Sequence, residues 1–169
     1  MDTPCSIQAV FLDPLREAAF TKTCVTRAVQ EAVPLFCGRF LTDLDFGGVL
    51  RRGTLTPWVV LRQYGNSCFV NARPLLADAL RAEVGLQEAE AAIRGGTQRI
   101  VVLSQILDAV QDGLLCSQDL AALVDARSSH TRVIFTGCSV SLEAAQSLGL
   151  SDIVALQTTA SFDQVFHGL

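Results

Sequence analysis

The sequence lacks the features that mark nucleic-acid-binding and membrane proteins. It holds 13 lysine and arginine residues against 17 acidic ones, a net charge of −4, so no basic field attracts a nucleic-acid backbone. No apolar run reaches the roughly 18 residues that a membrane helix needs. The N-terminal residues lack the basic and apolar segments of a signal peptide. We therefore expect a cytoplasmic protein that binds neither nucleic acid nor membrane.

The spacing of metal-binding residues is also absent. Six cysteines are present, but no two of them are spaced as Cys-x-x-Cys, and the only histidines are His130 and His167. This pattern predicts no metal site. We expect the cysteines to be reduced thiols that are mostly buried.

The composition is that of one globular domain. Half of the 169 residues are hydrophobic, which is enough for a full core. We expect a single α/β domain over residues 1–169, with 158–169 as a C-terminal tail. Short apolar runs alternate with helical patterns, which is typical of a mostly parallel central sheet flanked by helices. The predicted strands are 7–11, 35–40, 58–62, 68–70, 99–103, 132–135 and 152–156, and the predicted helices are 15–32, 74–94, 106–111, 117–126 and 141–148.

Two features of a nucleotide enzyme are missing where they would occur. A phosphate-binding loop would follow the strand at 7–11, but residues 12–19 contain no glycine. A metal-binding acid would follow the strand at 99–103, but the chain has Ser104 and Gln105 there, and neither side chain is charged. The chain thus has the pattern of a nucleotide-binding fold without its reactive groups.

The segment that replaces the phosphate loop has a physical role of its own. Asp13 followed by Pro14 is a strong helix start, with aspartate as the N-cap and proline in the first turn. The Asp13 carboxylate can accept the free N–H groups that a phosphate would otherwise use. Glu17 adds a second negative charge one turn on, and the helix dipole favours each carboxylate by roughly 0.3–1 kcal/mol. A triphosphate would meet both as like charges.

Ordered landmarks between residues 7 and 156 carry a family resemblance. They include a strand end at Gly65, the pair Cys68 and Phe69, and a long helix that leads through Gly95 into the strand at 99–103. Further landmarks are Asp108-Ala109, Gly113-Leu114-Leu115, Val133 to Gly137 and Ser151 to Val154. In this order they resemble the P-loop-type ATP:corrinoid adenosyltransferases, which transfer the adenosyl group of ATP to the reduced cobalt of a corrinoid. The resemblance implies a P-loop-NTPase-like (RecA-like) domain and a homodimer with the corrinoid near the subunit interface.

The chain departs from this family where the family binds ATP. In the ungapped alignment, Pro14 and Arg16 take glycine positions of the family's Gly-x-Gly-Lys-Gly-Lys-Thr-Thr loop, Glu17 takes the lysine position, and Ala18 takes a hydroxyl position. Ser104-Gln105 replace the family's Asp-Glu, Cys138 replaces an arginine, and Thr42 replaces a lysine after the second strand. We therefore expect no catalytic residue and no Mg·ATP binding of the usual kind.

Three hypotheses follow from the resemblance and its departures. The first is a degenerate, non-catalytic homologue that binds a corrinoid through Trp58, Cys68 and Phe69, or pairs with itself or with an intact paralogue. The second is an active adenosyltransferase with an altered ATP site that uses Lys22 and Thr23. The third is an interaction scaffold with no small ligand.

Overall fold

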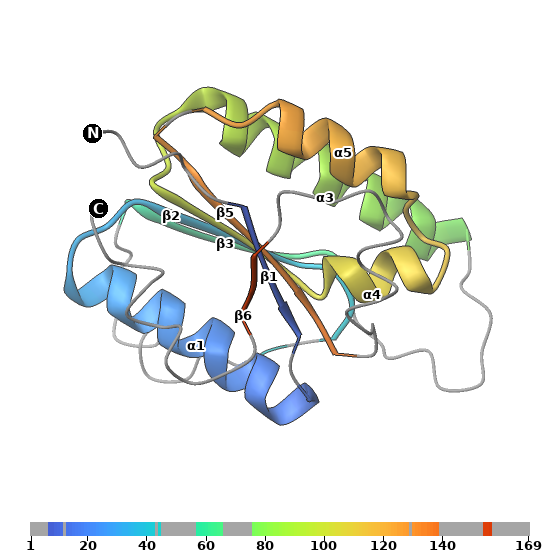
Figure 1. The fold of residues 1–169 in the computed structure, drawn as a ribbon, viewed down its shortest axis with the longest axis horizontal. Coiled ribbons are helices and arrows are strands. Elements are labelled where there is room, and N and C mark those ends of the chain that lie inside the picture. The colour runs from blue at the N-terminus through green and yellow to red at the C-terminus, as the bar shows by residue number, and fades with distance from the viewer. Residues whose placement is uncertain are drawn as a thin grey trace.

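The computed structural model describes residues 7–11, 13–42, 44, 57–65, 76–128, 130–138 and 154–156. They form an α/β domain in which a parallel sheet lies between two layers of helices (Figure 1). The strands are β1 (Ile7–Phe11), β2 (Leu35–Arg39), β3 (Val59–Gln63), β4 (Ile100–Ser104), β5 (Arg132–Gly137) and β6 (Val154–Leu156). The helices are α1 (Pro14–Gln30), α3 (Leu76–Gly95), α4 (Ile106–Gln111) and α5 (Ser117–Asp125).

The sheet order is β3-β2-β4-β5-β1-β6, and every described strand pair is parallel. Strand β5 lies between β1 and β4, which are the strands that lead into α1 and α4. The register aligns the strand ends, because Arg39 is paired with Ser104 and Phe11 with Gly137. The carboxyl ends of β1, β2, β4 and β5 therefore meet along one edge of the sheet, where ligands bind in parallel α/β folds.

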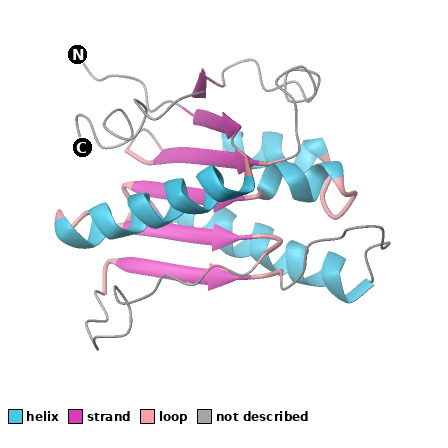
Figure 2. Ribbon diagram, turned by 90° about the horizontal axis from the view of Figure 1, so that it is seen from below, coloured by secondary structure: helices cyan, strands magenta, loops and turns pink. Residues whose placement is uncertain are grey.

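Helices cover both faces of the sheet, as a parallel sheet requires. Helix α1 lies on one face, and α3, α4 and α5 lie on the other (Figures 1 and 2). Alternate residues of β4 feed the two cores: Ile100 and Val102 pack on the α1 side, and Val101 and Leu103 pack on the opposite side. Successive side chains of a strand point to opposite faces of the sheet, and helices cover both faces. Every residue of this apolar run is therefore buried.

Local sequence sets the start of two helices. Asp13 is the N-cap of α1 and its Oδ1 accepts the N–H groups of Leu15 and Arg16 at 3.1 and 3.0 Å, with Pro14 as the first helical residue. This confirms the predicted helix start. Helix α5 has Cys116 as its N-cap, and the Asp119 carboxylate accepts the Cys116 N–H at 2.9 Å.

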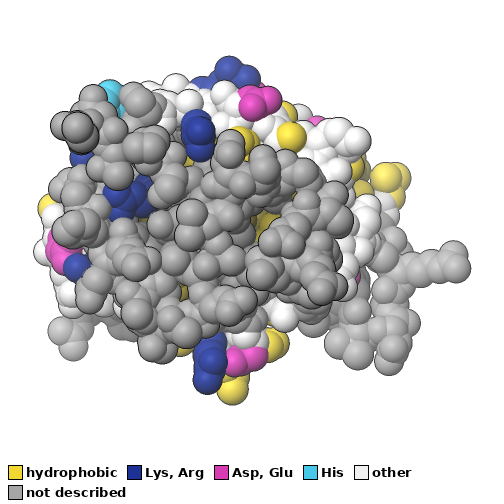
Figure 3. Space-filling view, viewed as in Figure 1, with side chains coloured by type: hydrophobic (Ala, Val, Ile, Leu, Met, Phe, Trp, Pro, Cys, Tyr) yellow, Lys and Arg dark blue, Asp and Glu magenta, His cyan; other side chains and the backbone are white. Residues whose placement is uncertain are grey.

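The other predicted boundaries that fall on described residues agree with the structure within two residues. The strand at 68–70, the helix at 141–148 and the tail at 158–169 lie outside the described residues. No helix in the described part of the chain is both long enough and apolar enough to span a membrane. On the face shown in Figure 3, the described side chains of both charge signs lie next to one another around the rim and do not separate into single-sign patches.

Candidate functional site

A buried carboxylate lies at the carboxyl edge of the sheet. Glu17, in the first turn of α1, is 0% exposed. Its Oε1 accepts hydrogen bonds from the hydroxyls of Thr21 at 2.9 Å, Ser104 at 2.5 Å and Thr136 at 2.8 Å. Its Oε2 accepts a hydrogen bond from Arg39 Nη1 at 2.8 Å, in an ion pair. All four partners donate, so Glu17 acts only as an acceptor, as an ionised carboxylate does. We call these five residues the Glu17 cluster.

Arg39 is the only cation of the cluster, and further contacts hold its guanidinium in place. The residue is 3% exposed, and its Nη1 also donates to Ser104 Oγ at 2.6 Å. Its Nε donates to the carbonyl of Thr42 at 2.6 Å, and its Nη2 donates to Thr42 Oγ1 at 2.8 Å. Removing charges from water is costly unless the pair is well bonded, and here no buried nitrogen or oxygen of these side chains lacks a partner.

Residues that follow the strands form a second layer around the cluster. The N–H and hydroxyl of Thr42 donate to Gln105 Oε1 at 2.8 and 2.9 Å. The backbone of Gln105 has φ 60°, in the left-handed region that few residues other than glycine adopt. Its N–H donates to Thr136 Oγ1 at 2.8 Å, so hydrogen bonds on both sides fix this unusual conformation. The side chains that end β2, β4 and β5 are therefore linked in one network.

Both thiols next to this edge are poor nucleophiles. Burial, then the charges of Asp108 and Glu17, raise the pKa of Cys138 to about 12. Burial and Glu17 raise the pKa of Cys37, in β2, to about 12. Because the thiolate is the reactive form, neither group can act in nucleophilic catalysis at neutral pH.

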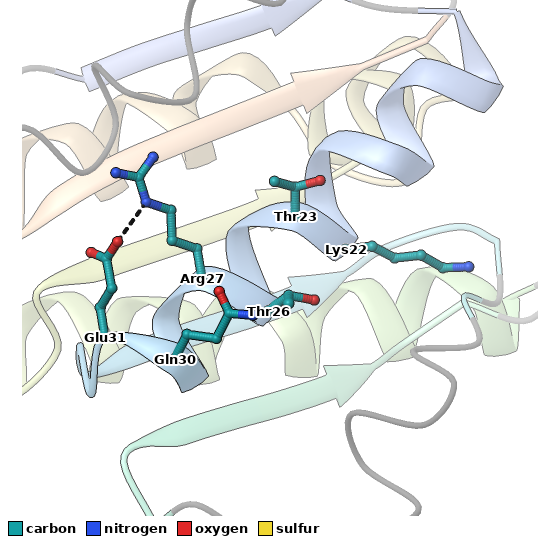
Figure 4. Close-up of a pocket in the computed structure, with 6 residues that line it drawn as sticks. All are labelled: Lys22, Thr23, Thr26, Arg27, Gln30 and Glu31. Carbon is teal, nitrogen blue, oxygen red and sulfur yellow. Dashed lines mark hydrogen bonds and ion pairs between the residues drawn. The ribbon is translucent and has the colours of Figure 1, made fainter.

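Lys22 and Thr23 are exposed on α1, whereas Glu17 and Thr21 of the same helix are buried. Both exposed residues lie in the middle turns of α1. They line a shallow groove together with Thr26, Arg27 and Gln30 (Figure 4). The Thr23 hydroxyl donates to the carbonyl of Ala19 at 2.8 Å. A phosphate-binding lysine acts next to the free N–H groups of a helix N-terminus, and at this terminus Asp13 accepts two of them.

Of the three residues expected at a corrinoid pocket, the structure describes Trp58 alone. Trp58 is half-buried just before β3, and its Nε1 donates to the carbonyl of Ala28 at 3.4 Å. It lies at the amino end of the strand, about 16 Å along the strand from its carboxyl end at 3.3 Å per residue. Cys68 and Phe69 lie outside the described residues.

Sequence reasoning missed Arg39, Thr21 and Thr136 as parts of the site. Arg39 and Glu17 are 22 residues apart, and Glu17 and Thr136 are 119 residues apart. One signal was available: Arg39 and Ser104 are the polar ends of apolar strands, and such ends meet when the strands are parallel neighbours.

The parallel sheet, the helix that follows its first strand and the polar cluster at their junction define a P-loop-like α/β domain. The family model for the ATP:corrinoid adenosyltransferases BtuR/CobO/CobP matches residues 18–155. Since this is most of the chain, the protein belongs to the ATP:corrinoid adenosyltransferase family. A comparison with curated proteins finds no match. The family match begins directly after Glu17, so β1 and the turn that enters α1 lie outside it.

Proposed function

We propose that this protein is a non-catalytic member of the corrinoid adenosyltransferase family that binds a corrinoid or pairs with an intact paralogue. It does not bind Mg·ATP as the family does. The observation that carries the proposal is the Glu17 cluster, in which the carboxyl edge of the sheet is filled by an internal ion pair. Helix α1 therefore presents carboxylates where the family presents a lysine and free N–H groups.

Charge at the start of α1 opposes a triphosphate. The buried Glu17 carboxylate has its single cation, Arg39, already bonded to it at 2.8 Å. Asp13 occupies the free N–H groups of the helix, which are the groups that favour a phosphate at a helix N-terminus. A triphosphate placed here would have to displace both carboxylates and leave at least one of them without a partner.

The residues that follow β4 do not suit Mg²⁺. The ion prefers oxygen ligands, of which one or two are carboxylates. Ser104 offers only a hydroxyl whose proton is given to Glu17, and Gln105 offers only an amide oxygen that already accepts two hydrogen bonds from Thr42. Among the described residues no group of three His, Cys, Asp or Glu side chains could hold a metal ion. These residues do not fit a Mg·ATP complex.

The corrinoid part of the proposal is supported by family membership. A corrinoid would be bound without reaction, because the described residues do not fit the Mg·ATP that the family's reaction consumes. The dimer is likewise a proposal, with either a second copy or an intact paralogue as the partner.

An anaerobic absorbance titration of cob(II)alamin with the protein tests the proposal. We expect a shift toward the spectrum of the four-coordinate form without ATP, and no change when Mg·ATP is added. A family member with an intact glycine-rich loop is the positive control. Absence of a shift well above micromolar protein would remove corrinoid binding and leave pairing with a paralogue. Formation of adenosylcorrinoid from ATP and a reduced corrinoid by this protein alone would overturn the proposal.

A further inference from the structure

We propose that the Glu17 cluster contains an oxyanion-binding cage, and that the Glu17 carboxylate is its built-in ligand in place of an anion from solution. The inference deepens the proposed function, because it states what occupies the edge from which Mg·ATP is excluded. The cage consists of four donors: the hydroxyls of Thr21, Ser104 and Thr136 and the guanidinium of Arg39. Its ligand class is a small carboxylate.

Three of the four donors, Arg39, Ser104 and Thr136, are held by contacts that do not involve Glu17. Arg39 and Ser104 are paired in register in neighbouring strands. The guanidinium of Arg39 is fixed by the carbonyl and the hydroxyl of Thr42, at 2.6 and 2.8 Å. The hydroxyl of Thr136 accepts the N–H of Gln105 at 2.8 Å. The sheet and its following turns therefore preorganise the cage, and Glu17 fills it.

The cage selects a small, singly charged ligand. Thr21, Ser104 and Thr136 are 0% exposed, so a bulky anion such as a nucleotide cannot enter without opening the edge. One guanidinium balances one negative charge, and the three hydroxyls converge on a single oxygen. Shortening Glu17 to alanine removes a CH₂–COO⁻ unit, which has the size of acetate. Formate and acetate are the matching probes.

The experiment is rescue of Glu17→Ala by an added anion, with thermal unfolding as the readout. We expect formate or acetate to raise the melting temperature of this variant along a saturable curve. At about a hundred times the dissociation constant the rise should be about 5–10 °C for a domain of this size. Acetamide, the neutral isostere of acetate, should have no such effect, and inorganic phosphate should act more weakly because it is larger.

Three controls separate the cage from a general salt effect. The melting temperature of the wild type should not rise with formate or acetate, because Glu17 already fills its cage. Glu90→Ala removes a carboxylate whose ion pair with Arg94, at 2.7 Å, lies on the surface, and should not respond either. Glu17→Ala/Arg39→Met lacks the cation and should lose the rescue. Equal responses of all four proteins, or no response of Glu17→Ala, would overturn the proposal.

A second variant decides the case in which Glu17→Ala does not fold. Glu17→Gln fills the same volume and keeps an oxygen for the hydroxyls, but it leaves Arg39 without an anion. The cage predicts that adding Arg39→Met to Glu17→Gln raises the melting temperature. A melting temperature of the double variant below that of Glu17→Gln would overturn the proposal. Because no arm of the experiment uses nucleotide or corrinoid, it can fail while the proposed function stands.

Discussion

Replacing Arg39 with methionine is the sharpest test of the energetics of the Glu17 cluster. The change keeps an unbranched apolar stem and removes the guanidinium. Glu17 then keeps its three hydroxyl donors but loses its only cation, at 2.8 Å. Ser104 loses a donor at 2.6 Å, and Thr42 loses two, at 2.6 and 2.8 Å. The variant therefore leaves a buried carboxylate uncompensated.

The magnitude follows from burial. Removing one partner of a buried ion pair typically costs about 3–5 kcal/mol, because the remaining charge stays desolvated. For a domain of 150–250 residues each kcal/mol lowers the melting temperature by about 2–4 °C. We therefore expect Arg39→Met to melt about 6–20 °C below wild type.

Urea denaturation and thermal unfolding, followed by circular dichroism, measure the effect. Arg94→Met is the matched control, since Arg94 pairs with Glu90 at 2.7 Å but its side chain is 64% exposed. An exposed helix pair of this spacing contributes about 0.3–0.5 kcal/mol. If Arg39→Met loses no more stability than Arg94→Met, then the buried pair does not hold the edge together and our reasoning is refuted.

Three further changes test neighbouring parts of the structure. Ser104→Asp puts a second carboxylate beside that of Glu17, which the Ser104 hydroxyl contacts at 2.5 Å. We expect the free energy of unfolding to fall by about 3–5 kcal/mol and calorimetry to detect no Mg²⁺ binding. A stable variant that binds Mg²⁺ would contradict this. Gly85→Ala places a Cβ 2.6 Å from the ring of Tyr64, and we expect urea denaturation to show a fall of about 1–3 kcal/mol in the free energy of unfolding. An unchanged midpoint would contradict this, because it would mean that the ring moves aside at no cost. Burial and the Glu17 charge raise the pKa of Cys37 from 9.0 to about 12, so the folded protein holds the thiol proton more tightly than the unfolded chain does. The contribution of this protonated thiol to folding stability is therefore present below about pH 9 and is lost as the pH rises toward 12. Peptide mass mapping after iodoacetamide at pH 8 should find the exposed Cys116 modified and Cys37 unmodified, and equal labelling would refute the burial of Cys37.

The parts of the site that depend on neighbouring residues could be predicted from the sequence. Asp13 and Pro14 specify the start of α1 through bonds that span two or three residues. The polar residues after β4 were also visible, because a strand that is otherwise apolar ends at Ser104. Local chemistry was sufficient in both cases.

The pairing of Glu17 could not be predicted in the same way. The sequence suggested that Glu17 acts through the helix dipole toward an incoming phosphate. The structure shows it fully buried and bonded to Arg39, whose position depends on which strands are neighbours and in which register. Sheet order is a property of the whole chain, and no spacing within the sequence specifies it.

Direct measurement of Mg·ATP binding by isothermal titration calorimetry tests the central claim. The protein should release no binding heat up to millimolar nucleotide, and Lys22→Ala should behave as wild type does. The intact family member used as the positive control should bind under the same conditions. Micromolar binding by this protein, abolished by Lys22→Ala, would contradict the account and would place the nucleotide on the exposed face of α1.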